Sequence, residues 1–311
     1  FMLPVLSAQA EPGVPLTAAG SLMVVAAMAK SAQVPLHFWL PRAMVAPTPV
    51  SAYLHSAAMV AAGVFLLERV YLLLRPSGAI LDGLVVVGLT SMLIGGVLAL
   101  TQNVLKQLLA YSTVAQYGYV VLLLGLGGAA GVAGASLYVM AHALVKSALF
   151  LTAGAVTEAT GEDRLSHLGG LGRRAPVLAV FGGLAAAGLA GLPATVGFFK
   201  DEALFTAALQ RGWLFAGLAV LAASLTLAYI WRFWAGIFLG RAVGDPRPLS
   251  PLLVIPIVLL GLAVVAGGVY VAPFAHLAAA AASASLGTTL LIDPSYHWDA
   301  RPENLMTLAV Y

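Results

Sequence analysis

Long runs of apolar residues dominate the chain and are separated by short polar segments. A helix needs about 20 mostly apolar residues to cross the hydrocarbon core of a bilayer. Runs of this kind predict eight spans, of which six are continuous and two are interrupted. The continuous spans cover 50–74, 81–100, 104–126, 133–156, 213–239 and 252–275. The interrupted spans cover 16–46 and 175–209, and a further apolar run at 277–291 has no clear assignment.

Each interrupted span contains a proline near its middle. Pro35 lies in the first span, and Pro193, followed by Gly197, lies in the second. Proline removes a backbone donor from a helix, and at membrane depth the freed carbonyls need protein or water partners. Such breaks usually line a cavity, although a proline kink can also serve packing alone. Two interrupted spans about 160 residues apart are typical of transporters built from repeats, which favours a role in transport.

Composition indicates a membrane protein. Apolar residues make up 61% of the 311 residues and charged residues 9%, against about 25% charged residues in an average soluble domain. A soluble fold needs more polar surface than this, and a disordered chain is less apolar, so both are excluded. The formal charge of +3 is too small to indicate nucleic acid binding. We therefore expect an all-α fold, a polytopic transmembrane helical bundle of about eight spans with two broken helices.

The two ends of the sequence do not resemble complete termini. Residue 1 is Phe, and no basic region precedes the first apolar residues. The last seven residues, 305–311, begin another apolar run. We interpret residues 1–311 as a single transmembrane domain that is an internal fragment of a longer chain.

All four lysines lie inside the predicted spans, whereas the loops carry arginine. They are Lys30, Lys106, Lys146 and Lys200. A charged side chain in the membrane centre costs about 3 kcal/mol or more, so such residues usually face an interior path. A desolvated lysine can release its proton, whereas arginine effectively cannot. The pattern predicts titratable groups along a proton path, with the alternative that Lys106, close to a span end, extends to the interface.

Two histidines extend this pattern. His55 lies in the middle of the span at 50–74, and His142 lies one helical turn from Lys146, so these two side chains share a face. Tyr138 extends that face by another turn. Histidine exchanges protons near neutral pH, although a lone buried histidine is more often a packed core residue. Together with four interior lysines, the two histidines favour a relay.

Acidic residues are scarce in the spans. Asp201 and Glu202 adjoin Lys200 and are possible ion-pair partners for it. Glu68 lies near the end of its span beside Arg69, and we expect it at the membrane interface. The chain has no cysteine, which excludes disulfides, thiolate iron–sulfur clusters and cysteine zinc sites within it. No motif indicates a metal or cofactor, so we expect none in this chain.

Several long motifs, in order and at similar spacing, resemble the antiporter-like membrane subunits. That family includes the large subunits of Mrp-type cation/proton antiporters and the distal pump subunits of respiratory complex I (the L, M and N subunits of NADH-quinone oxidoreductase). The motifs are Lys30-Ser-Ala-Gln-Val-Pro-Leu-His-Phe-Trp-Leu-Pro41, Ala46-Pro-Thr-Pro-Val-Ser-Ala-Tyr-Leu-His-Ser56, Leu109-Ala-Tyr-Ser-Thr113 with Gln116 and Gly118, Ala141-His-Ala-Leu-Val-Lys146-Ser-Ala-Leu-Phe-Leu151, and Gly191-Leu-Pro193 with Gly197-Phe-Phe-Lys200-Asp-Glu202. The resemblance implies an antiporter-like core over 16–240 and extra C-terminal helices over 250–311.

The resemblance also implies a proton relay. Its residues, in chain order, are Lys30, His55, Lys106, His142, Lys146 and Lys200. The family usually has a serine before the lysine of its second broken helix, whereas Phe199 stands here. This leaves open whether Lys200 or Asp201 holds the exit-site role. The acidic partner that the family pairs with Lys30 is expected upstream of Phe1.

Within the family, the motifs at 43–56 and 152–157 look most like the large A-type subunit of Mrp antiporters. That resemblance implies a proton-translocating, multi-pass subunit of a multisubunit Na⁺/H⁺ antiporter in the cell inner or plasma membrane. Its partners would be other membrane subunits, the lipid bilayer, H⁺ and Na⁺. Three alternatives stay open: a distal proton-pumping subunit of NADH:quinone oxidoreductase, a subunit of an inorganic-carbon uptake complex, and a structural subunit with a vestigial channel.

Overall fold

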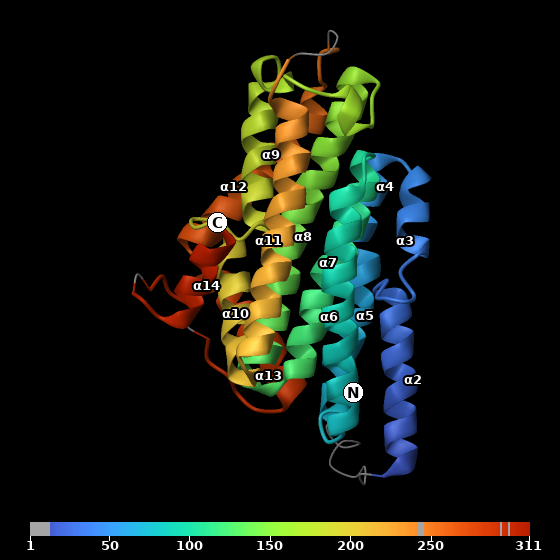
Figure 1. Ribbon diagram of the computed structural model, residues 1–311, viewed down its shortest axis with the longest axis vertical. Helices are drawn as coiled ribbons and strands as arrows, with labels where there is room; N and C mark the ends of the chain where they lie inside the picture. The colour runs from blue at the N-terminus through green and yellow to red at the C-terminus, as the bar shows by residue number, and fades with distance from the viewer. Residues whose placement is uncertain (1–12, 242–245, 293, 298) are drawn as a thin grey trace.

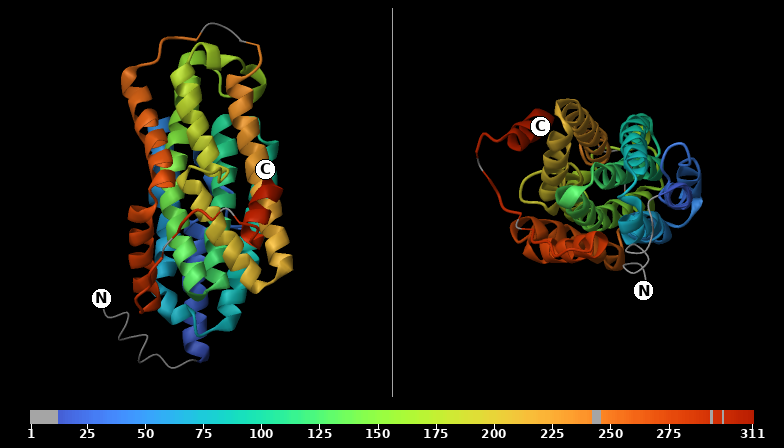
Figure 2. Two further views of the ribbon diagram at one scale, coloured as in Figure 1. Left: turned by 90° about the vertical axis from the view of Figure 1, so that its left-hand side faces the viewer. Right: turned by 90° about the horizontal axis from the view of Figure 1, so that it is seen from below.

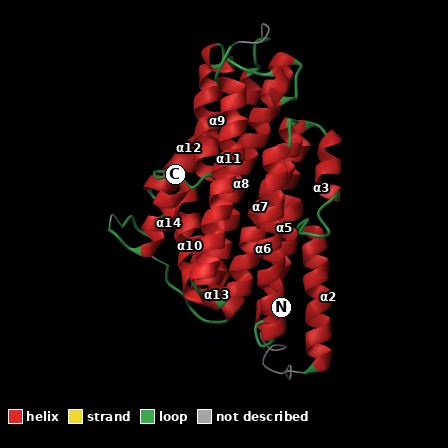
Figure 3. Ribbon diagram, in the orientation of Figure 1, coloured by secondary structure: helices red, strands yellow, loops and turns green. Residues whose placement is uncertain are grey.

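Helices make up most of the chain in the computed structural model, which describes residues 13–241, 246–292, 294–297 and 299–311 (Figures 1 and 3). Outside the helices, Val104 and Arg164 form an isolated antiparallel bridge, and no strand is assigned within the described ranges. The expected all-α fold is confirmed.

Six helical segments are long and apolar enough to cross a membrane, judged by length and composition among the residues described. They are α4, the π-helical turn η2 and α5 together (Thr48–Leu74), α6 (Gly78–Thr101), α7 (Leu105–Leu126), α8 (Gly128–Thr160), α11 (Trp213–Phe238) and α12 (Pro251–Val269). These correspond one to one with the six continuous spans expected from the sequence. Long apolar runs bounded by polar or glycine residues are therefore sufficient to locate them.

One boundary prediction was wrong. The span expected at 252–275 ends at Val269, and a separate helix, α13 (Ala272–Leu286), follows it. The backbone leaves helical geometry at Tyr270, with φ −130° and ψ 84°. Pro273 then lies in the first turn of α13, where its missing N–H leaves no acceptor unpaired. Apolar composition on both sides of this turn hides it from a hydropathy count.

The first interrupted span is a helix, a break and a second short helix. α2 (Val14–Lys30) ends before the break at 31–38, which contains Pro35, and α3 (Trp39–Arg42) with the 3-10 turn η1 (Ala43–Val45) follows. Other helices supply hydrogen-bond partners for backbone and side-chain groups in this break. The Ser31 hydroxyl donates to the carbonyl of Val60 at 2.7 Å, and the Val34 amide donates to the hydroxyl of Ser91 at 3.0 Å.

The second interrupted span has the same design. α9 (Pro176–Leu189) and α10 (Val196–Arg211) are separated by a break at 190–195 that contains Pro193. Gly197, in the first turn of α10, packs so closely on the backbone of Gly188 that no side chain fits there. Both predicted helix breaks are thus confirmed. The remaining short elements are η3 (Leu165–His167), η4 (Leu171–Arg173) and α14 (Pro302–Val310).

The long helices run side by side along one axis, with α8 at their centre (Figures 1 and 2). α8 packs against α4, η2, α7, α9, α10, α12 and α13. α2 and α3 lie at one edge of the bundle and α14 lies at the opposite edge, whereas α13 packs against α5 and α8. Side chains on the inner face of α8 are therefore surrounded by protein on all sides.

The backbones of α6 and α7 pack very closely at four glycines. Gly88 and Gly95 lie seven residues apart on α6, and Gly118 and Gly125 lie seven residues apart on α7. A Cβ atom at any of the four would meet backbone atoms of the opposite helix. Small residues at such intervals let two helix backbones approach closely in a membrane. We call these four residues the glycine seam.

Candidate functional site

The inner face of α8 carries three polar side chains at one-turn intervals. Tyr138, His142 and Lys146 are all buried, at 0%, 1% and 0% exposure. A spacing of four residues places them on one face of the helix, and this face packs against α7. His142 and Lys146 therefore share one face of α8, as their spacing predicts.

Neutral groups of α7 hold the Lys146 ammonium. It donates to the carbonyl of Leu109 at 2.9 Å and to the hydroxyl of Ser112. Its Nζ lies 5.9 Å from the centroid of the Phe150 ring. No carboxylate pairs with it in the described part of the chain. Carbonyl and hydroxyl oxygens can accept from an amine in either charge state, which suits a group that exchanges a proton.

Both interior histidines retain hydrogen-bonding capacity. His142 has neither ring nitrogen bonded, and His55 lacks a partner at Nδ1, as far as the described residues show. The His142 ring lies edge-on to Tyr117, with centroids 4.9 Å apart. The His55 ring lies 5.3 Å from that of Phe150. Buried polar atoms are normally bonded, so unpartnered imidazole nitrogens mark groups available to other donors or acceptors.

His55 lies in a local irregularity of its helix. Leu54–Ala58 form η2, a π-helical turn between α4 and α5. The Ser56 hydroxyl donates to the carbonyl of Ala52 at 2.5 Å. A π turn widens the helix and occurs frequently at functional sites. No residue pattern in the sequence predicts this turn.

Lys200 and Asp201 form an ion pair in the first turns of α10. Their Nζ and Oδ1 atoms are 2.8 Å apart, and the two residues are 1% and 9% exposed. The Lys200 ammonium also lies 4.6 Å from the ring centroid of Tyr138, close enough for a cation–π contact. The ion pair therefore reaches the same face of α8 that carries His142. Asp201, one of the two possible partners named from the sequence, is thus the residue that pairs with Lys200.

The other predicted partner, Glu202, faces away. It lines a cavity of about 360 Å³ together with Phe199 and His297, and no ion pair joins it to Lys200 in the described part. Of the two possible partners named from the sequence, only Asp201 forms an ion pair with Lys200 among the described residues.

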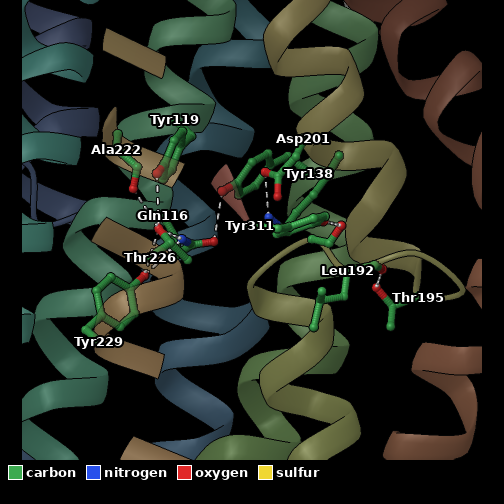
Figure 4. A network of polar contacts seen from close by, with 12 residues as sticks. Gln116, Tyr119, Tyr138, Leu192, Thr195, Asp201, Ala222, Thr226, Tyr229 and Tyr311 are labelled. Carbon is green, nitrogen blue, oxygen red and sulfur yellow. Dashed lines mark hydrogen bonds and ion pairs between the residues drawn. The ribbon is translucent and has the colours of Figure 1, made fainter. Parts of the chain in front are cut away.

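A buried hydrogen-bond network extends from Tyr138 across α7 to α11 (Figure 4). The Tyr138 hydroxyl donates to Gln116 Oε1 at 2.8 Å. Gln116 Nε2 donates to the Tyr229 hydroxyl at 3.1 Å and to Thr226 Oγ1 at 3.3 Å. Thr226 Oγ1 lies 3.1 Å from the Tyr119 hydroxyl. Of these residues, sequence reasoning singled out Gln116 and Tyr138 and missed the other three, for which the only signal is a polar group in an apolar run.

Two tyrosines of the C-terminal segment hold the second helix break. The Tyr311 hydroxyl donates to the carbonyl of Gly191 at 2.5 Å and lies near Asp201 (Figure 4). The Tyr296 hydroxyl accepts from the Ala194 amide at 3.0 Å and donates to the carbonyl of Gly268 at 2.8 Å. Backbone groups freed by the break thus find partners from a distant part of the chain. We call this pair the tyrosine clasp.

Two predicted relay lysines lie outside this interior group. Lys106 is half-buried in the first turn of α7 and donates to the carbonyl of Ala46 at 2.9 Å, which links α7 to the segment after η1. Lys30 is the last residue of α2 and is exposed. No hydrogen bond or ion pair connects Lys30 to the other relay residues over the ranges described. The structure therefore brings together His55, His142, Lys146 and Lys200 on or around α8, but neither of these two.

A family model and two relatives match most of this chain. Residues 6–226 match the family model described as NADH:quinone oxidoreductase/Mrp antiporter, TM. The chain is 40% identical over 233 residues to a probable K⁺/H⁺ antiporter A/B subunit of Rhizobium meliloti (strain 1021), covering 73% of this chain and 23% of that protein. It is 39% identical over 262 residues to the L subunit of NADH-quinone oxidoreductase of Mycobacterium tuberculosis (strain ATCC 25618 / H37Rv), covering 81% of this chain and 41% of that protein.

A solved structure matches almost the whole chain. A chain in the structure of the Mrp complex from Dietzia sp. DQ12-45-1b superposes with a TM-score of 0.88 at 38% sequence identity. The match covers 95% of this chain and 33% of that one. The chain thus spans between 23% and 41% of the length of these relatives. The fold is that of a multi-pass membrane protein of this kind.

Proposed function

Because the chain belongs to the NADH:quinone oxidoreductase/Mrp antiporter transmembrane family, we propose that it forms the proton-conducting part of a larger ion-translocating subunit. The observation that carries this proposal is the buried series on and around α8. Lys146, His142 and the Lys200–Asp201 pair lie within the protein interior, each with groups able to accept or donate a proton. Intramembrane ionisable residues are rare and usually mark an ion path.

The proposed path has an inner and an outer part. Protons move between His55, His142 and Lys146 in the centre, and between this centre and Lys200 past Tyr138, with water carrying them across the gaps. Asp201 favours the charged form of Lys200, so separation of the pair makes proton release from Lys200 easier. The break before α10 is the place where such a movement would occur, because regular helix is interrupted there between α9 and α10. Lys30 and Lys106 are proposed as the remaining members of the relay, on the resemblance alone.

We further propose that the whole protein is part of a multisubunit cation/proton antiporter in the inner or plasma membrane. The near-complete match to a chain of the Mrp complex favours this interpretation. The cation is Na⁺ by resemblance, and K⁺ is the competing choice, since a relative is named for it. We propose no cofactor for this chain. The alternative is a proton-pumping subunit of NADH:quinone oxidoreductase, favoured by the similarity to the L subunit of that enzyme.

The experiment uses the full-length protein with its membrane partners in inverted vesicles. Proton movement is followed with a pH-sensitive dye after addition of NaCl or KCl in separate trials. Lys200→Ala is expected to lower cation-driven proton transport by at least about tenfold, with assembly unchanged. Arg211→Ala is the matched control, because Arg211 is exposed on the same helix and pairs with Asp82 at 2.6 Å. Wild-type transport in Lys200→Ala would contradict the proposed path.

The redox alternative has a separate test. If the complex that contains this protein is purified and shows flavin and iron–sulfur absorbance, it is a redox-driven pump. A colourless complex that exchanges cations for protons would support the antiporter. Neither result depends on the Lys200 variant.

A further inference from the structure

Glu68 carries a carboxylate well inside an apolar helix. Six residues, or ~9 Å of helix at 1.5 Å per residue, separate it from the end of α5 at Leu74. Its Oε1 accepts a hydrogen bond from the Ser136 hydroxyl of α8 at 3.2 Å. Ser136 itself lies eight residues, or ~12 Å, into α8. Its carboxylate therefore lies between two helices that are long and apolar enough to cross a membrane.

No basic side chain neutralises this carboxylate in the described part of the chain. Arg69 follows it directly but points about 100° away around the helix and is exposed. Lys30 on the neighbouring α2 and His276 on the neighbouring α13 are also exposed. An unpaired carboxylate in a membrane span is costly in its charged form, so it takes up a proton or a cation.

A cavity gives Glu68 access from outside the helix bundle. Its volume is about 330 Å³, and Glu68 is the one ionisable group among its lining residues. The small side chains of Ala57, Ala58, Ala61 and Ala62 leave this space open. Ala57 and Ala58 belong to the π-helical turn η2, which also carries His55. The cavity thus abuts the widened turn of the predicted relay.

Tyr117 lies between this cavity and the interior group. Its hydroxyl donates to the carbonyl of Ser56 in η2 at 3.4 Å, and its ring lies edge-on to His142 at 4.9 Å. Tyr117 therefore contacts η2, the turn that supplies Ala57 and Ala58 to the cavity, on one side and the unpartnered imidazole of His142 on the other.

We propose that Glu68 is a proton-binding site that loads His142 from the lateral cavity. A proton from the cavity binds the carboxylate and gives a neutral carboxylic acid. The same proton then leaves the acid, passes through the Tyr117 hydroxyl or a water molecule, and binds an imidazole nitrogen of His142. The carboxylate that remains accepts the Ser136 hydrogen bond again. This inference rests on the proposed function, to which it adds a second entrance.

The test is Glu68→Gln in the full-length protein and its complex, in the same vesicle assay. Glutamine has the size of glutamate and can accept from Ser136, but it cannot take up a proton. Transport is expected to fall by at least about tenfold, and Glu68→Asp is expected to retain most of it with a shifted pH profile. Glu158→Gln makes the same charge change at an exposed position near the end of α8 and is the matched control.

Two further measurements separate a proton carrier from a structural residue. The infrared difference spectrum between high and low pH should contain the carbonyl stretch of a protonated acid, absent in Glu68→Gln and kept in Glu158→Gln. Ala62→Leu narrows the cavity without changing charge and should slow transport severalfold. This variant tests the cavity independently, also in the case that Glu68→Gln does not assemble. Wild-type rate and pH profile in Glu68→Gln, or an unchanged rate in Ala62→Leu, would overturn the proposal. Absence of transport in the wild type would instead overturn the proposed function itself.

Discussion

At the residue scale, the two deeply buried lysines differ in what holds them. Lys146 has a carbonyl and a hydroxyl as partners, whereas Lys200 has a carboxylate. A carboxylate favours the charged form of its partner, and neutral oxygens accept from either form. The two positions therefore suit different tasks, passing a proton at Lys146 and retaining one at Lys200 until Asp201 moves.

Lys146→Arg is expected to abolish transport although it preserves the positive charge. Arginine effectively never releases its proton, so it cannot pass one on. In vesicles, cation-driven proton movement should fall by at least about tenfold. Arg211→Lys is the matched control, because it exchanges one cation for another at an exposed position outside the proposed relay, where Arg211 pairs with Asp82. Equal activity of the two variants would mean that Lys146 serves only as a fixed charge.

Residue types in apolar runs were enough to predict the interior group but not its partners. His142 and Lys146 could be placed on one face because their spacing within a helix determines it. Tyr229 and Tyr311 could not be assigned to the site, since they reach it from α11 and the C-terminal segment, which are distant in the sequence. Helix packing brings them there, and packing leaves no mark in a single sequence.

At the element scale, the two broken helices are stabilised by different parts of the chain. Nearby helices supply the partners at the first break, where Ser31 and Ser91 form hydrogen bonds. The C-terminal segment supplies those at the second, through the tyrosine clasp of Tyr296 and Tyr311. Proline and glycine predicted both breaks. Their partners depend on tertiary contacts that hydropathy does not encode.

Tyr311→Phe is expected to loosen the second break without unfolding the protein. It removes a hydroxyl that donates to Gly191, an interaction worth about 1 kcal/mol. Amide hydrogen exchange at 188–197 should accelerate by about fivefold, which is the same free energy expressed as a rate. Tyr270→Phe, an exposed tyrosine at 68% exposure, is the matched control. Unchanged exchange at 188–197, measured by mass spectrometry, would show that the clasp does not hold this segment.

At the scale of the whole molecule, the described helices form a partial bundle with apolar side chains on its outside. Leu22 and Val25 of α2 are 72% and 56% exposed, and Leu252 and Leu259 of α12 are 84% and 61% exposed. Exposed apolar faces of this extent contact lipid or other protein. The matched relatives are more than twice as long as the matched segment, so both kinds of contact are available to this chain.

Lys30→Ala in the full-length protein is expected to abolish transport while leaving assembly intact. Lys30 is exposed at the end of α2, and its place in the relay rests on the proposed function. Transport in vesicles should fall by at least about tenfold. Arg42→Ala, at an exposed cation in α3, is the control for loss of charge on this edge. Normal transport in Lys30→Ala would remove Lys30 from the relay.

The glycine seam between α6 and α7 has a consequence for energy conservation. Backbone packed directly on backbone at Gly88, Gly95, Gly118 and Gly125 leaves no room for a file of water molecules. Beside the proposed proton path, the seam would therefore block ion leakage, since ions cannot cross a dry wall of paired helices. A single added methyl group at Gly118 would force the helices apart. Ions would then leak across the membrane beside the proposed path without driving transport.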